Sequence, residues 1–106
     1  MAWIYLVLAG VFEIGWPLGL KLSQVTSHRA LWISAAVAAM GLSGLFLWLA
    51  QRNIAMGTAY AVWTGIGAAG TFTVGILFFR DPANALRIVS VSLIILGIIG
   101  LRLSHV

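Results

Sequence analysis

Glu13 is an acidic residue inside a long apolar stretch, and the segment from Met1 to Leu20 carries no other charged side chain. An unpaired carboxylate in the hydrocarbon of a membrane costs at least about 2.5 to 3.5 kcal/mol, and such residues usually belong to ion or substrate sites. A salt bridge to a cation at the same depth is the structural alternative, but the other apolar stretches offer no Lys or Arg there. We therefore interpret Glu13 as a cation site that exchanges its cation for a proton.

Aromatic residues recur at helical spacing around this acid. Trp16 follows Glu13 by three residues, and Tyr60 and Trp63 form a second pair with the same spacing, so each pair lies on one helical face. Apolar packing is the simpler interpretation of each ring. Beside a carboxylate, however, the rings suit a box for a cation. Their faces attract positive charge, and indole and phenol groups donate hydrogen bonds to the acid.

Ser43 and Pro17 are polar or irregular features within apolar stretches. The Ser43 hydroxyl can bond to a carboxylate on a facing helix or to the carbonyl four residues earlier in its own helix. Pro17 has no N–H for the Glu13 carbonyl, so the sequence predicts a kink in the helix, or a freed carbonyl, beside Glu13.

The other reactive residue types do not complete an enzyme or a metal site. The sequence has no cysteine, and no second acid or histidine accompanies Glu13 for acid–base or nucleophilic catalysis. His28 and His105 lie at polar ends with no second ligand close in sequence. We expect a protein that is not an enzyme and that holds no metal or cofactor, with protons as the coupling ion.

The elements that position these residues are apolar helices. The composition, 62% hydrophobic and 8% charged, is far from that of a soluble domain, and a helix needs about 20 apolar residues to cross a bilayer. We predict one all-α transmembrane domain over residues 1–106, with spans at about 2–22, 31–50, 57–79 and 84–103. Asp81 and Pro82 are expected as the N-cap and first-turn proline of the last helix.

The basic residues give only a weak preference for one orientation in the membrane. An even number of spans puts both termini on one side. The first and third loops with their flanks lie on one side and carry Lys21, Arg29, Arg80 and Arg87. The second loop and the C-terminal end lie on the other side and carry Arg52 and Arg102. This bias is small under the positive-inside rule, so such a chain can insert both ways round. The net charge of +4 is spread over the loops, which does not support nucleic-acid binding.

Small residues recur where helices would meet. In the third span they come every fourth residue, at Gly57, Ala61, Gly65 and Ala69. In the last span they share one helical face, at Ser90, Gly97, Gly100 and Ser104. Such residues permit close backbone approach, and they favour either packing within one chain or a dimer interface. Because four thin helices cannot readily enclose a polar cavity alone, we expect an oligomer.

Three stretches of the sequence are similar to one family of transporters. They are GTAYAVWTGIGAAG from Gly57 to Gly70, FEIGWPLGLK in the first span and LRIVSVSLIILGIIGLRLS in the last. Over the whole chain the sequence resembles the small multidrug resistance family, in particular its guanidinium-exporter subtype. The drug-exporting subtype usually lacks Trp at the position of Trp16, which favours the guanidinium branch. Gly15 and Pro17 depart from the residues usual in the guanidinium-exporter subtype.

The resemblance implies a function and an assembly. Glu13 would be a shared proton and cation site, lined by Trp16, Ser43, Tyr60 and Trp63, in an antiparallel homodimer of dual topology in the bacterial inner membrane. The implied activity is proton-coupled export of guanidinium or small polar substituted guanidinium cations across the lipid bilayer. Two alternatives stay open, namely a broad exporter of quaternary ammonium compounds and a structural subunit of a larger membrane complex.

Overall fold

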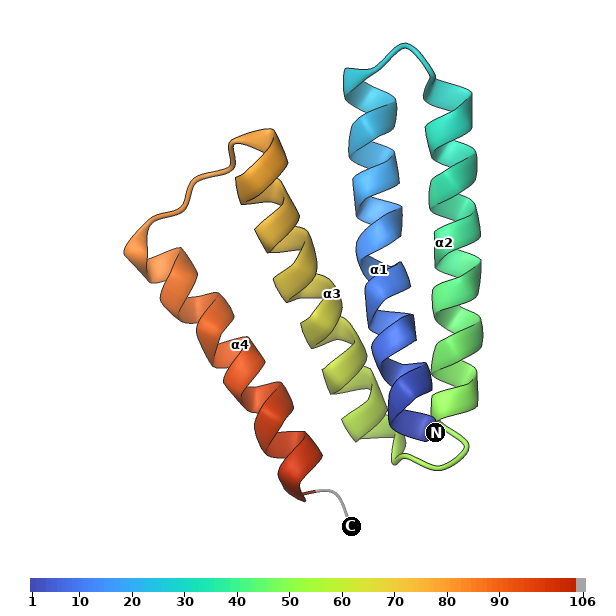
Figure 1. Cartoon of the computed structure of the whole chain (residues 1–106), viewed down its shortest axis with the longest axis vertical. Helices are drawn as coiled ribbons and strands as arrows, with labels where there is room; N and C mark the ends of the chain where they lie inside the picture. The colour runs from blue at the N-terminus through green and yellow to red at the C-terminus, as the bar shows by residue number, and fades with distance from the viewer. Residues whose placement is uncertain (105–106) are drawn as a thin grey trace.

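The computed structural model describes residues 1–104, which form four helices. They are α1 (Ala2–Val25), α2 (Arg29–Ala50), α3 (Met56–Phe79) and α4 (Ala85–Ser104), as Figure 1 shows. Each is long and apolar enough to cross a membrane, which confirms the predicted all-α fold with four spans. Helices satisfy their own backbone N–H and C=O groups, as the hydrocarbon of a membrane requires. The observed ends differ from the expected ones by three residues at most, and α1 shows the largest difference because it continues to Val25.

The helices lie side by side in the order α4, α3, α1 and α2 (Figure 1). The molecule measures 47 × 34 × 16 Å, so it is a flat slab. The start of α1 and the end of α4 lie at the same end of this slab, opposite the α1–α2 and α3–α4 loops. Helix α1 packs against both α2 and α3, whereas α4 packs against α3. A side chain on α1 can therefore reach groups from two other helices.

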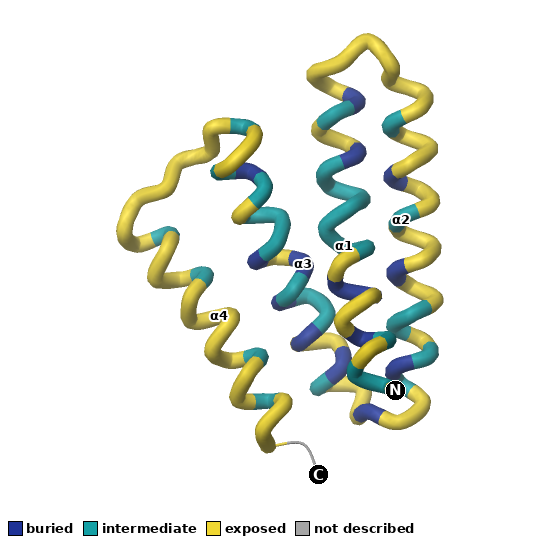
Figure 2. Tube along the Cα trace, viewed as in Figure 1, coloured by how far each residue is buried: buried dark blue, intermediate teal, exposed yellow. Residues whose placement is uncertain are grey.

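Burial is concentrated where α1, α2 and α3 meet (Figure 2). A small apolar core lies near the α2–α3 loop and consists of Leu6, Ala50, Ile54, Ala59 and Val62. No residue of α4 is buried. The chain alone thus covers α4 only in part, on the side that packs against α3.

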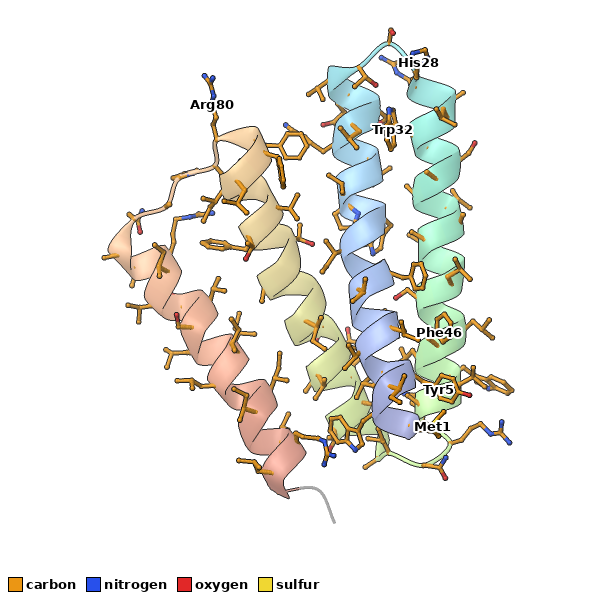
Figure 3. The ribbon with its side chains drawn as sticks, in the orientation of Figure 1. Met1, Tyr5, His28, Trp32, Phe46 and Arg80 are labelled. Atoms are coloured by element: carbon orange, nitrogen blue, oxygen red, sulfur yellow. The ribbon has the colours of Figure 1, made fainter. Side chains whose placement is uncertain are left out.

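Rings and small residues hold α1 against α2. The ring of Phe46 stacks on Tyr5 at 6.1 Å and on Phe12 at 5.7 Å between centroids, and Figure 3 shows Tyr5 and Phe46 side by side near the start of α1. Towards the other end of the helix pair, a Cβ added to Gly19 would meet Ala36 at 3.0 Å. Aromatic stacking thus fixes one end of the pair, and close backbone approach fixes the other.

Helix α3 approaches α1 closely through two glycines. Ile66 of α3 packs on Gly10 of α1, where an added Cβ would lie 2.6 Å from the Ile66 side chain. In the reverse sense, Ile14 of α1 fills the space over Gly70 of α3. Each glycine makes room for a branched side chain from the facing helix. These two contacts set the position along α3 at which Glu13 meets that helix.

The small residues of α3 do not form one continuous ridge. Gly65 is buried against Ile94 and Ile98 of α4, and Ala69 is also buried, whereas Gly57 and Ala61 are exposed. A repeat of four residues advances by about 40° per step on a helix of 3.6 residues per turn, so the four positions wind around the helix. The inner pair therefore packs within the chain and the outer pair does not.

The small residues of α4 face away from the rest of the chain. Ser90, Gly97 and Gly100 are exposed. A Cβ added to Gly97 or to Gly100 would meet nothing within 4 Å. Packing within one chain therefore does not explain this face.

The prediction that Asp81 is the N-cap of the last helix was wrong. The residue that caps α4 is Asn84, whose Oδ1 accepts a hydrogen bond from the Arg87 backbone N–H at 2.9 Å. Asp81 instead folds back over α3, where its N–H donates to the Gly75 carbonyl at 3.1 Å. The cause is Arg80, which ends α3 in the left-handed conformation with φ 58° and projects outward (Figure 3). This turn directs Asp81 towards α3, so α4 begins only after a further extended stretch.

Helix α1 is continuous through Pro17. The proline sits in its interior, four residues after Glu13, and lacks the N–H that would bond to the Glu13 carbonyl. A bend at this point stays a prediction.

Candidate functional site

The site is built around the Glu13 carboxylate, on the side of α1 between α2 and α3. Trp16, one helical turn later, donates its indole N–H to Glu13 Oε1 at 2.8 Å. This contact is local, because residues three apart share a helical face. It fixes one carboxylate oxygen before any other helix takes part.

Ser43 connects α2 to this acid through the backbone of α1. Its side chain is 1% exposed, and its hydroxyl donates to the Ala9 carbonyl at 2.8 Å. Glu13 Oε1 lies farther from the Ser43 Oγ, at 3.5 Å. The alternative of a bond within its own helix was wrong, because the main partner is a carbonyl of the facing helix.

Trp63 brings α3 into the same network. Its indole N–H donates to Ser43 Oγ at 2.8 Å, so Trp63 reaches Glu13 through the serine hydroxyl. Tyr60 lies one turn earlier, and its ring meets that of Trp63 at 5.5 Å between centroids, tilted by 59°. The Tyr60 side chain is 57% exposed. The structure thus assembles Glu13, Trp16, Ser43 and Trp63 into one group and places Tyr60 at its open edge.

Sequence reasoning missed two members of the site. Gly67 of α3 lies directly against the acid, since a Cβ added there would be 2.5 Å from Glu13 Cγ. The carbonyl of Ala9 supplies the acceptor for Ser43. The three glycines at positions 65, 67 and 70 were a visible signal for close packing. A backbone carbonyl leaves no signal in a sequence.

The carboxylate has no cationic partner in the described chain. Within residues 1–104, no basic group forms an ion pair with Glu13, and both protein donors address Oε1. Over the same residues, Oε2 accepts no hydrogen bond from the protein. A carboxylate oxygen in this position can accept either a proton or the N–H group of a cation.

Within residues 1–104, histidine contributes nothing to this centre. His28 lies at the α1–α2 loop, far along the helices from the start of α1 (Figure 3), and His105 lies outside the described residues. Among the described residues, no group of three or more metal-ligating side chains could hold an ion.

Four apolar helices, three of which meet at a hydrogen-bonded acid that has no basic partner among residues 1–104, define a small multi-pass membrane protein with an ionisable site. Residues 1–94 match the sequence model of the Small Multidrug Resistance protein family, and the chain belongs to that family. It is 44% identical to the guanidinium exporter of Escherichia coli K12, covering 98% of each chain. It is 48% identical to the guanidinium exporter of Yersinia pseudotuberculosis, covering 98% of this chain and 99% of the relative.

A third relative has a similar level of identity and coverage. The guanidinium exporter of Proteus vulgaris is 43% identical, with 98% of this chain and 99% of that protein covered. Each of these proteins therefore matches along nearly its full length. Family and helices together identify a multi-pass protein of the inner membrane.

Proposed function

We propose that this protein is a proton-coupled antiporter that exports guanidinium or small polar substituted guanidinium cations, with protons and cation competing for Glu13. The observation that carries this proposal is the asymmetry of the carboxylate. Oε1 receives the Trp16 indole N–H at 2.8 Å, while Oε2 accepts no hydrogen bond from residues 1–104. The relatives named as guanidinium exporters support the same class of cargo.

Guanidinium suits this site for two reasons. Its planar N–H groups match the fork of a carboxylate, as those of Arg do. The rings of Trp16, Trp63 and Tyr60 offer faces that attract a flat cation. Since Ser43 donates mainly to Ala9, the protein leaves most of the charge of Glu13 for the cargo.

The proposed working unit is an antiparallel homodimer. The slab-like chain has no buried residue in α4, and the spaces beside Gly97 and Gly100 are open, so a second copy could cover this face. Inserted in opposite orientations, two identical chains form the inverted repeat that larger transporters contain within one sequence. Their two Glu13 residues would face one cavity near the midplane. If only the proton-loaded and cation-loaded forms change sides, the proton gradient drives export of the cation.

No enzymatic step and no cofactor are part of this proposal, and the proton is the coupling ion. A quaternary ammonium exporter is the second candidate, because the tilted pair of Tyr60 and Trp63 offers an exposed aromatic surface. Such ions bring no N–H donor to Glu13. Competition between guanidinium and a tetraalkylammonium ion for transport separates the two candidates.

The test is transport by the purified protein in proteoliposomes under an imposed pH gradient. The unchanged chain should exchange guanidinium for protons, and Glu13→Gln should lose this exchange while eluting as the same oligomer. Ser34→Ala is the control, since its hydroxyl bonds only to the Ala30 carbonyl of its own helix. Proton-coupled exchange by the Gln variant would show that Glu13 is not the shared site. Absence of transport by the unchanged chain would favour a structural subunit.

A further inference from the structure

A cavity of about 220 Å³ lies between α1 and α3, one helical turn beyond Glu13. Pro17, Lys21, Thr71 and Asp81 supply its polar or irregular lining, and apolar side chains form the rest, among them Ile14 and Phe79. Glu13 is not part of the lining. It lies four residues before Pro17, however, on nearly the same stripe of α1. The cavity is therefore a continuation of the Glu13 face towards the end of the molecule that carries the α3–α4 loop.

Pro17 lies inside α1 and lines this cavity. In a regular helix the N–H of residue 17 would bond to the carbonyl of Glu13. Proline has no N–H, so this bond cannot form. Pro17 lines the cavity, whereas Glu13, to which this carbonyl belongs, does not.

Thr71 adds a hydroxyl whose hydrogen-bonding capacity is unused. Two other threonines of α3 bond back to their own helix, Thr64 to the Tyr60 carbonyl and Thr73 to the Ala69 carbonyl, each at 2.8 Å. The Thr71 hydroxyl forms no hydrogen bond with any residue in 1–104. Its hydroxyl can therefore donate to and accept from a molecule in the cavity.

Lys21 and Asp81 place opposite charges on the same cavity. Within residues 1–104 neither of them takes part in an ion pair. A second full charge on the cargo would be attracted by one of these groups and repelled by the other. A neutral substituent that has both N–H donors and a carbonyl acceptor can match the two together.

We propose that this cavity is a subsite for the neutral, amide-like substituent of a monosubstituted guanidinium whose cationic group sits on Glu13. The substituent's N–H groups bond to Asp81, and its carbonyl oxygen accepts from Thr71 and Lys21. One helical turn rises about 5.4 Å, so a link of one or two carbons spans the two positions. This inference rests on the proposed function, and it adds the place where a substituent is recognised.

Two probes with the same number and connectivity of heavy atoms test the subsite. Guanidinoacetamide carries a primary amide on a one-carbon link, and isobutylguanidinium carries two methyl groups in place of the amide oxygen and nitrogen. The measurement is the ratio of their proton-coupled transport rates in proteoliposomes. The unchanged protein should prefer guanidinoacetamide. Thr71→Val, which keeps the shape and removes the hydroxyl, should lower the ratio by about five- to tenfold.

Thr73→Val is the matched control, because its hydroxyl is already bonded within α3, and it should leave the ratio unchanged. Equal ratios for Thr71→Val and Thr73→Val would overturn the subsite while guanidinium transport by the unchanged protein still upheld the proposed function. Failure of the unchanged protein to carry guanidinium would overturn both.

Discussion

The indole N–H of Trp63 on α3 donates to the hydroxyl oxygen of Ser43 on α2 at 2.8 Å. Helices α2 and α3 lie on opposite sides of α1 (Figure 1), so this bond links two helices across the face that carries Glu13. The same hydroxyl donates to Ala9 of α1. Three helices are thus joined at one oxygen atom, and the acid beside it is held without an opposite charge.

Replacing Ser43 should weaken cation binding. Ser43→Ala leaves the Trp63 N–H and the Ala9 carbonyl without this partner, a loss of about 1 to 3 kcal/mol for buried groups. We expect the dissociation constant for guanidinium to rise about tenfold, measured by calorimetry on the purified protein. Ser34→Ala, on the same helix but exposed, should change it by less than about twofold. Equal binding by the two variants would remove Ser43 from the site.

A methyl group at Gly67 should displace the acid. The Cβ of Gly67→Ala would lie 2.5 Å from Glu13 Cγ, and overpacking of this kind costs about 1 to 3 kcal/mol. We expect a lower unfolding midpoint in detergent and at least about a tenfold loss of cation affinity. Gly41→Ala is the control, because a Cβ there meets nothing within 4 Å. A Gly67→Ala protein with normal affinity would show that Glu13 does not depend on this contact.

The weak charge bias makes membrane orientation testable. Tags on the C-terminus should report both sides of the membrane. Adding positive charge to the α2–α3 loop through Gln51→Lys with Asn53→Lys should shift the chains to one orientation and reduce transport to less than about half. Co-expression with a Ser27→Lys chain, biased the opposite way, should restore it. A single orientation of the unmodified chain with full transport would contradict the antiparallel dimer.

The two candidate caps of α4 predict different stabilities. Asn84→Ala removes the side-chain acceptor for the Arg87 N–H, which costs about 0.5 to 2 kcal/mol for an N-cap. Asp81→Ala should have the smaller effect on the unfolding midpoint in detergent, because the bond from Asp81 to α3 comes from its backbone. The reverse order of the two midpoints would restore Asp81 as the cap.

Local spacing was sufficient to predict part of this site. The pairing of Glu13 with Trp16 needs only one helix, and the pairing of Tyr60 with Trp63 needs only another. The partner of Ser43 could not be predicted, because it depends on which helix lies beside α2 and at what depth. The sequence contains no direct signal for the carbonyl of Ala9.

The loop before α4 shows the same limit. Asp81 and Asn84 both carry side chains that cap helices well. The choice between them follows from the left-handed turn at Arg80, a conformation that non-glycine residues seldom adopt. The pattern of residue types in the sequence does not predict this turn.

The order of helices along the chain also determines when the site can form during synthesis. Glu13, Trp16, Ser43 and Trp63 belong to α1, α2 and α3, and Gly67 is the last residue needed around the acid. The carboxylate can therefore obtain its hydrogen bonds while α4 is still within the ribosome. Because α4 buries none of its own residues, it enters the bilayer with its outer face uncovered. The nascent chain thus completes the contacts of its acid first and adds its most exposed helix last.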